Sequence, residues 1–172
     1  MNAAEVAIAF RPLQAADEPL LRQWLVAPHV TQWWRDPEAE LRDALAHVAT
    51  GDAEAFVIRG NGHDIGYIHA YDAREDSYFA DQAPGTKGMD LYLGYKDLVG
   101  RGLGRRVIAA FADRLLAAGA PAVVADPETK NIAAVAAYRH AGFRLYRVHC
   151  GAAPGNLILM SKTATLETSQ VS

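Results

Sequence analysis

The segment Gly100-Arg101-Gly102-Leu103-Gly104 constrains the fold more than any other stretch of this 172-residue chain. Its alternate glycines permit a tight turn. Apolar residues at helical spacing follow it, namely Val107, Ile108, Phe111 and Leu115. An alternating pattern over residues 88–95 precedes the turn, and a short apolar run, 122–125, follows the helix. Strand, turn, helix and strand in this order are typical of a crossover unit, so we expect an α/β fold.

The remaining residues alternate between strand and helix patterns. Further strands are predicted over residues 6–10, 53–59, 64–71, 143–150 and 156–162, and the Asn61-Gly62 pair predicts a hairpin. Helices are predicted between Asp17 and Pro28, between Asp36 and Gly51, and over 131–141. We interpret residues 1–162 as a single domain and residues 163–172 as a flexible tail.

Composition limits the classes of function. The chain is 51% hydrophobic, which suffices for a core at this length, and its net charge of −3 disfavours a nucleic-acid partner while permitting a cationic substrate. The single cysteine, Cys150, cannot form an internal disulfide, and the histidines lack metal-ligand spacing. No apolar run reaches the roughly 18 residues of a membrane span. We expect a cytoplasmic enzyme or binding protein without a metal, and no membrane partner.

The glycine turn is a candidate anion site. Backbone N–H groups at the start of a helix bind phosphate oxygens, and Arg101 and Arg105 add positive charge. The spacing departs from the dinucleotide fingerprint, which needs glycine at Arg105, and from the P-loop. The alternative is a tight turn beside a solvated basic face.

A second motif lies in the predicted helix 131–141. Asn131, Ala134 and Tyr138 stand at i, i+3 and i+7, so they share one face of that helix. Small residues on this face allow something flat or extended to approach closely. The alternative for Tyr138 is ordinary packing in the core.

Together, the glycine turn and Asn131, Ala134, Tyr138, Gly142 and Phe143 resemble the GNAT superfamily of acyl-CoA-dependent N-acyltransferases. The resemblance covers roughly the whole chain. It implies a mixed α/β fold in which a mostly antiparallel, twisted sheet of about seven strands is flanked by about four helices. Two strands, beginning at residues 88 and 122, would splay to admit acyl-CoA. Val99 is a departure, because many members have Gln or Arg there.

The resemblance also implies a site for acetyl-CoA as co-substrate. The pyrophosphate would bind the turn, and the thioester would lie beside the strand residues Leu91, Tyr92 and Leu93. The N–H of Leu91 or Tyr92 would stabilise the oxyanion, and Tyr138 would protonate the departing thiolate. The implied cofactor-binding residues are Leu91, Tyr92, Leu93, Val99, Gly100, Arg101, Gly102, Leu103, Gly104, Arg105, Asn131, Ala134 and Tyr138.

Amine acylation needs a base, because an alkylammonium has no free lone pair. Asp90 is the candidate, since Gly88-Met89-Asp90 resembles the corresponding segment of aminoglycoside 6′-N-acetyltransferases. The segments His29-Val30-Thr31-Gln32-Trp33-Trp34 and Ile65-Gly66-Tyr67 also resemble that subfamily. The alternative is an ordinary outward-facing aspartate. The residues proposed as catalytic are Asp90 and Tyr138.

The substrate is expected to be a polycationic sugar. Acidic residues gather in segment 72–86, which we expect to be an exposed loop, and aromatic residues nearby could form a wall of the cleft. His69 could line the same cleft. Simple solvation of an acidic loop is the alternative, and the predicted closing turn, 153–156, lacks the acidic residue that such enzymes often have. The predicted substrate-binding residues are Trp33, Trp34, Tyr71, Asp72, Glu75, Asp76, Asp90 and Asp126.

We therefore expect transfer of an acetyl group from acetyl-CoA to a primary amine, the 6′-amine of an aminoglycoside, by a monomer or homodimer. Other acceptors stay open. One is hydroxylysine in siderophore biosynthesis, for which we would expect histidine in place of Asp90. A polyamine or a protein amino terminus is another. A non-catalytic CoA-binding module is the alternative outside the enzyme class.

Overall fold

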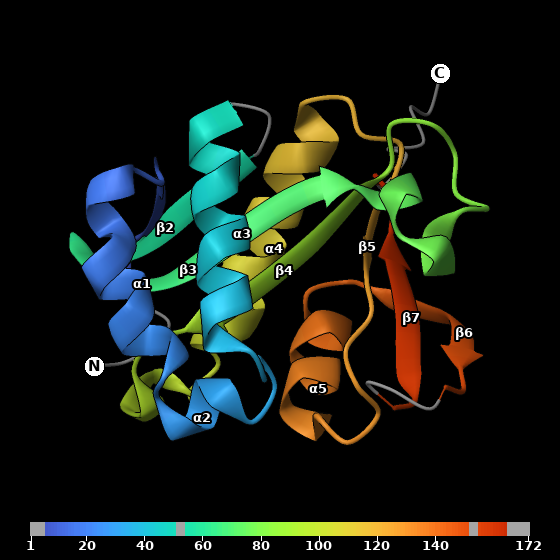
Figure 1. The fold of residues 1–172 in the computed structure, drawn as a ribbon. Coiled ribbons are helices and arrows are strands. Elements are labelled where there is room, and N and C mark those ends of the chain that lie inside the picture. The colour runs from blue at the N-terminus through green and yellow to red at the C-terminus, as the bar shows by residue number, and fades with distance from the viewer. Residues whose placement is uncertain (1–5, 51–53, 152–154, 165–172) are drawn as a thin grey trace.

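The computed structural model describes residues 6–50, 54–151 and 155–164 (Figure 1). Its strands are β1 (Ile8–Pro12), β2 (Glu54–Gly60), β3 (His63–Asp72), β4 (Lys87–Leu93), β5 (Val123–Ala125), β6 (Arg144–His149) and β7 (Leu157–Lys162). Its helices are α1 (Glu18–Leu25), α2 (Pro28–Thr31), α3 (Pro37–Thr50), α4 (Leu103–Ala117) and α5 (Ile132–His140). The predicted order of elements is confirmed. The short helix α2 is additional, because Pro28 both ends α1 and begins a new turn with its fixed φ.

All seven strands form one sheet in the order β1-β2-β3-β4-β5-β7-β6. Every neighbouring pair is antiparallel except β4 and β5, so the predicted mostly antiparallel sheet is confirmed. The predicted hairpin joins β2 to β3, with positive φ at Asn61 (50°) and Gly62 (82°). Residues 153 and 154 of the predicted closing turn and most of the predicted tail, 165–172, lie outside the described residues.

The helices cover both faces of the sheet (Figure 1). Helices α1 and α3 pack on one face, where Leu21, Trp24 and Leu41 meet Val57, Tyr67 and Tyr92. Helices α4 and α5 share the core of the other face, which includes Val107, Phe111, Tyr138, Ile68 and Met89. Successive β4 side chains therefore enter different cores, which is the period of two expected of a strand buried on both faces.

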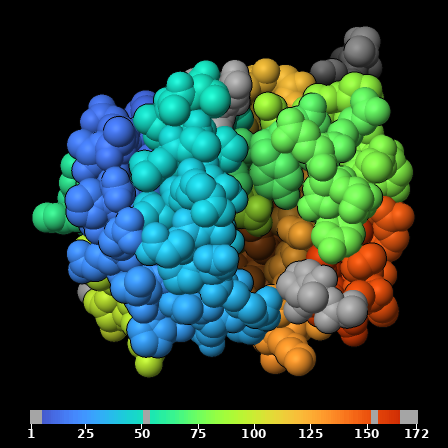
Figure 2. All heavy atoms as spheres, viewed as in Figure 1, coloured from blue at the N-terminus to red at the C-terminus, as the bar shows by residue number. Residues whose placement is uncertain are grey.

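The strands β4 and β5 separate almost as soon as they pair. Their register contains only Lys87↔Val123 and Gly88↔Val124, after which β4 continues through residues 89–93 without β5 beside it. The predicted splay is thus confirmed. Figure 2 shows a hollow in the surface between the α2–α3 segment and the residues that follow β3.

Segment 72–86 is more ordered than the exposed loop we expected. It forms two 3₁₀ turns, Ala73–Glu75 and Ser77–Phe79, and it buries Phe79 and Thr86 completely. Asp72 and Asp76 cap these turns by accepting hydrogen bonds from the N–H groups of residues 74 and 78. The buried apolar side chain of Phe79 anchors the segment to the core. Our prediction of an exposed loop considered only the acidic residues of the segment.

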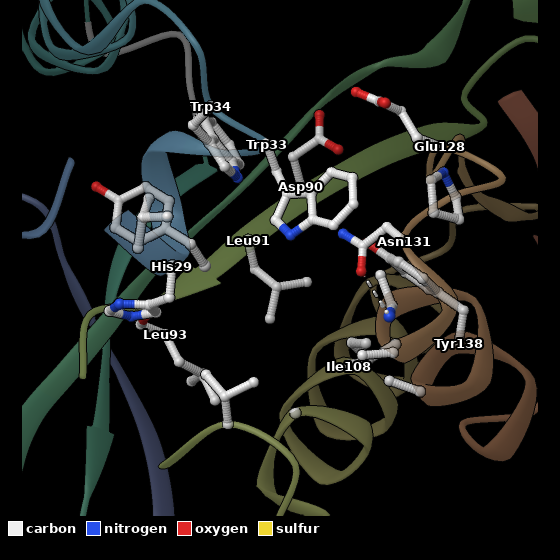
Figure 3. Close-up of a pocket in the computed structure, with 18 of the residues that line it drawn as sticks. His29, Trp33, Trp34, Asp90, Leu91, Leu93, Ile108, Glu128, Asn131 and Tyr138 are labelled. Atoms are coloured by element: carbon white, nitrogen blue, oxygen red, sulfur yellow. Dashed lines mark hydrogen bonds between the residues drawn. The ribbon is translucent and has the colours of Figure 1, made fainter. Parts of the chain in front are cut away.

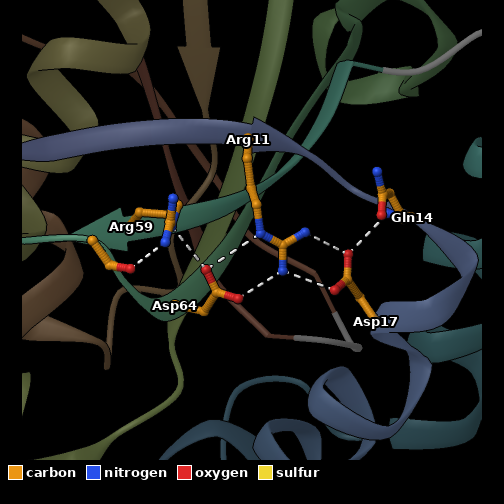
Figure 4. Close-up of polar contacts among 6 residues, drawn as sticks. Arg11, Gln14, Asp17, Arg59 and Asp64 are labelled. Carbon is orange, nitrogen blue, oxygen red and sulfur yellow. Dashed lines mark hydrogen bonds and ion pairs between the residues drawn. The ribbon is translucent and has the colours of Figure 1, made fainter.

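An ion-pair network fastens the β1 edge of the sheet (Figure 4). The Arg11 guanidinium contacts the carboxylates of Asp17, which precedes α1, and Asp64 in β3, each at 2.7 Å. Hydrogen bonds from Arg11 hold the pKa values of both aspartates below their usual range. Arg59 of β2 adds a contact to Asp64 at 3.2 Å. These residues serve the fold, since none of them lines the cleft described below.

Candidate active site

A cleft of about 1250 Å³ opens where β4 loses its neighbour, and it is the hollow seen in Figure 2. Its walls come from α2–α3, the middle of β3 and β4, the turn before α4, and the β5–α5 segment. Among the predicted site residues, those lining it are Trp33, Trp34, Asp90, Leu91, Tyr92, Leu93, Val99, Gly100, Arg101, Gly102, Gly104, Arg105, Asp126, Asn131, Ala134 and Tyr138. The topology thus brings both sequence motifs to one site.

The glycine turn presents its backbone to the cleft. Gly100 and Gly102 have φ of 79° and 80°, which only glycine adopts readily, and Gly102 is the N-cap of α4. Gly104 differs, because its φ is not positive, and a Cβ placed there would meet no atom within 4 Å beyond its chain neighbours and the backbone of its own helix. Its missing side chain therefore leaves empty space at the first turn of α4, where unpaired N–H groups favour an anion.

Other predicted cofactor residues divide between the cleft and the core. The Leu103 side chain is buried in the core and does not line the cleft. Asn131 is the N-cap of α5 and accepts a hydrogen bond from the Ala134 N–H at 3.1 Å. The amide of Asn131 therefore has a structural partner as well as a place in the wall. Arg101 and Arg105 are exposed in the wall of the cleft.

Tyr138 reaches from α5 across the gap to β4 (Figure 3). Its hydroxyl donates a hydrogen bond of 3.4 Å to the carbonyl oxygen of Met89, and its ring packs edge-on against Phe143 with centroids 5.1 Å apart. Burial, with the nearby carboxylates of Asp90 and Asp126, raises the pKa of Tyr138 well above its usual value. The phenol therefore carries its proton at neutral pH and can donate it.

The open edge of β4 presents alternate peptide groups to the cleft. The carbonyl of Met89 faces Tyr138, and the carbonyl of Leu93 lies 3.0 Å from Nε2 of His29 in α2. Within a regular strand, the peptide groups of residues i and i+2 point to the same edge. The N–H of Leu91 therefore points toward the cleft, while the N–H of Tyr92 points toward β3. Of our two predicted oxyanion donors, this geometry favours Leu91.

Asp90 extends from β4 and lines the cleft, as do Trp33 and Asn131 (Figure 3). Burial raises its pKa well above the usual value, and the charges of Asp126, Glu40 and Asp76 raise it further. Asp126 is similarly affected, with a pKa raised to about 6 mainly by burial and also by Asp76. No cationic side chain among the described residues forms an ion pair with Asp90 or Asp126. The site thus holds carboxylates without a counter-charge.

The wall that α3 supplies was not predicted from the sequence. Glu40, Asp43 and His47 line the cleft at i, i+3 and i+7, beside the helix stripe that packs in the core. Burial, together with Asp43 and Asp36, raises the pKa of the Glu40 carboxyl. The sequence does contain these three residues as a polar stripe at helical spacing. Such a stripe usually faces solvent, so it did not indicate a cleft wall.

The predicted aromatic wall and the acidic segment have separate positions. Trp34 packs edge-on against Tyr92 at the margin of the core, with ring centroids 5.0 Å apart. Trp33 is half-buried in the cleft wall. Tyr71 does not line the cleft, because its ring lies across Gly88, where no Cβ would fit. Asp72, Glu75 and Asp76 do not line it either, and of these only Asp76 acts on Asp90, through its charge.

An ion pair spans the cleft near its mouth. The Arg35 guanidinium, between α2 and α3, contacts both carboxylate oxygens of Glu128, which follows β5, at 2.8 and 2.9 Å. Both residues line the cleft. Sequence gives no sign of this contact between positions so far apart. It joins the two walls and removes Glu128 from the set of uncompensated carboxylates.

The model for the acetyltransferase (GNAT) domain family matches residues 14–149. The chain belongs to the GNAT acetyltransferase family. The predicted resemblance is therefore confirmed, and family members are acetyl-CoA-dependent enzymes. Within the described residues, none of the helices is long and apolar enough to cross a membrane. In the same residues, no three His, Cys, Asp or Glu side chains are grouped to hold a metal ion.

Curated relatives share one named activity. The chain is 29% identical over 151 residues to aminoglycoside N(6′)-acetyltransferase type 1 of Klebsiella pneumoniae, covering 79% of this chain and 73% of that protein. The protein of the same name from Serratia marcescens gives the same values. Among solved structures, aminoglycoside acetyltransferase AAC(6′)-Ib in complex with coenzyme A and kanamycin has a TM-score of 0.80 at 25% identity, covering 91% of this chain and 95% of that one.

Proposed function

We propose that this protein acetylates a primary amine of an aminoglycoside, at the 6′ position, with acetyl-CoA as donor. The observation that carries the proposal is a group of carboxylates that line the cleft and form no ion pair among the described residues, namely Glu40, Asp90 and Asp126. A polycation supplies the counter-charge that such a group lacks. The relatives named as aminoglycoside N(6′)-acetyltransferases support the same substrate class.

The residues present fit acetyl-CoA. The turn formed by residues 100–104 offers backbone N–H groups for phosphate oxygens, and Arg101 and Arg105 add positive charge. β4 continues past its two pairs with β5, and the cleft that opens there is lined by Leu91. When bound, the co-substrate supplies an acyl group activated as a thioester. Leu91 then donates its N–H to the carbonyl oxygen, which gains negative charge during attack.

Asp90 accepts the proton that the acceptor ammonium must lose before its nitrogen can attack. Its raised pKa makes it a stronger base than an ordinary aspartate, and the approach of a cationic substrate favours its ionised form. The nitrogen then forms a bond to the acyl carbon, and the carbon–sulfur bond breaks. Tyr138 donates its hydroxyl proton to the departing sulfur. The nitrogen loses its second proton to solvent as the amide forms, so the products are the amide and CoA thiol. Asp90 then releases its proton to solvent, and solvent restores the proton to Tyr138.

Thiol release is the direct test. Purified protein with acetyl-CoA should release CoA thiol with kanamycin and much less with an aminoglycoside that bears a hydroxyl at the 6′ position. Asp90→Asn should lower kcat by roughly 100-fold or more, the contribution of a general base. Asp97→Asn is the matched control, because Asp97 is exposed and does not line this cleft.

Two outcomes would overturn the proposal. Equal release with the 6′-hydroxyl compound would move the reaction to another amine. Release with spermidine or hydroxylysine but with no aminoglycoside would change the substrate class. Cytoplasmic location and a monomeric or homodimeric state stay predictions.

A further inference from the structure

His69 of β3 lies beside Asp90 on the floor of the cleft. The two residues are opposite each other in the β3–β4 register, and both line the cleft. Side chains of directly opposite residues stand on the same face, with Cβ atoms roughly 5 Å apart. A substrate whose amine reaches Asp90 therefore also passes the imidazole.

Aromatic neighbours fix the orientation of this imidazole. Tyr67 and Tyr71, two residues away on either side in β3, have ring centroids 5.5 and 5.7 Å from it. His47 of α3 closes a third side at 5.8 Å. These three rings restrict the rotation of the imidazole, so the direction of its nitrogen atoms is set before any substrate binds.

One nitrogen of this fixed ring has no partner. Nδ1 of His69 is buried, and no group among the described residues forms a hydrogen bond with it. A buried polar atom without a partner is unfavourable, and native proteins satisfy nearly all of them with protein, water or ligand. Since His69 lines the cleft, a molecule bound there can supply the partner.

We propose that His69 recognises the acceptor, with Nδ1 accepting a hydrogen bond from a hydroxyl or amino group adjacent to the amine that attacks. This inference rests on the proposed function and refines it. Aminoglycosides carry several hydroxyl and amino donors close to the 6′-amine, whereas a simple monoamine carries none. The contact therefore selects amino sugars over simple amines.

The electrostatics of the ring agree with an acceptor role. Burial, together with the smaller effect of His47, lowers the pKa of His69 to about 4. The imidazole is therefore neutral at physiological pH and keeps a lone pair on one nitrogen. A neutral ring also avoids repelling a polycation, which a protonated ring beside Asp90 would do.

Steady-state kinetics on two variants test the assignment. His69→Leu should raise the KM for kanamycin about tenfold, the effect of one lost hydrogen bond in a binding site. Its KM for acetyl-CoA should stay within about twofold of wild type, since the cofactor wall is unchanged. His69→Gln keeps an oxygen that can accept a hydrogen bond, so it should recover most of the lost affinity. His63→Leu is the control, because His63 is exposed at the start of the same strand and does not line this cleft.

The wild-type protein gives a second readout that needs no substitution. Binding of kanamycin in the presence of CoA should shift the ¹⁵N resonance of His69 Nδ1. An unchanged resonance, or a kanamycin KM of His69→Leu equal to that of wild type, would overturn the inference while leaving the proposed function intact. Equal losses in His69→Leu and His69→Gln would also overturn it. Wild-type protein that acetylates no aminoglycoside would instead remove the proposed function and this inference with it.

Discussion

The two walls of the cleft are built from different materials. The wall formed by the glycine turn, α4 and α5 uses backbone groups and small residues, and its arginines are exposed. The wall formed by α3, β3 and β4 uses polar side chains, among which the half-buried Asp90 and Glu40 have raised pKa values. A backbone cradle suits a co-substrate that every family member shares. Side chains are what a specific acceptor requires, so we expect substitutions in the two walls to have separable effects.

The largest separable effect is expected at Gly104. Because a Cβ there enters empty space at the start of α4, Gly104→Val should obstruct phosphate binding and raise the Kd for acetyl-CoA about 100-fold. The melting temperature should change little, since a Cβ at this position has open space around it. Calorimetric titration measures the first quantity and thermal unfolding the second.

Gly102→Ala provides the contrasting control. It should lower stability by roughly 1–2 kcal/mol, because alanine at φ of 80° is strained. A Gly104→Val protein that unfolds early but binds acetyl-CoA normally would show that this glycine serves the helix instead of the ligand.

Asp126, which follows β5, should reveal the cost of a carboxylate without a counter-charge. Its pKa is raised from 3.8 to about 6 in the folded protein, so folding binds a proton that the unfolded chain releases. The stability associated with Asp126 is complete below about pH 4 and is lost as pH rises to 6. Asp126→Asn should therefore raise the melting temperature at pH 8 by roughly 5 °C.

This gain should shrink as the pH of the melting experiment falls toward 4. The control Asp97→Asn should give no pH-dependent gain, since Asp97 is exposed. A gain at pH 8 that persists unchanged at pH 4 would assign the effect to packing and not to charge.

A smaller effect is expected at Glu40. Glu40→Gln removes a carboxylate that raises the pKa of Asp90, so the pH at which kcat/KM rises should move to lower values. The same change should raise the acceptor KM about fivefold by removing one partner for an ammonium group. A pH–rate profile with kanamycin measures both.

Glu38→Gln is the matched control, because Glu38 lies in the same helix but pairs with Arg22 outside the cleft. A profile that moves equally in both variants would contradict the placement of Glu40 beside Asp90.

The comparison also explains which parts of the molecule could be predicted. The turn at Gly102 and the hairpin at Asn61-Gly62 depend on local backbone conformations that few residue types permit, so their sequence signals are strong. The role of α3 depends on which face meets the cleft, and Glu40 and Asp43 look like any solvated pair until β3 and β4 are in place. The opposite error occurred in segment 72–86. Its acidic residues predicted an exposed loop, although the buried side chain of Phe79 anchors it to the core.

The open edge of β4 has a consequence for solubility. Unpaired strand edges invite β-strands of other chains, and proteins often protect them with lysine, proline or a bulge. Residues 89–93 contain none of these residues, and their register with β3 is regular. Here Tyr138 and His29 already engage the carbonyls at the two ends of the edge. An intruding strand would find its ladder interrupted at both ends, whereas a single acyl group needs only the N–H between them. The protein can therefore expose an unpaired backbone N–H group to its substrate without offering a strand edge on which other chains can aggregate.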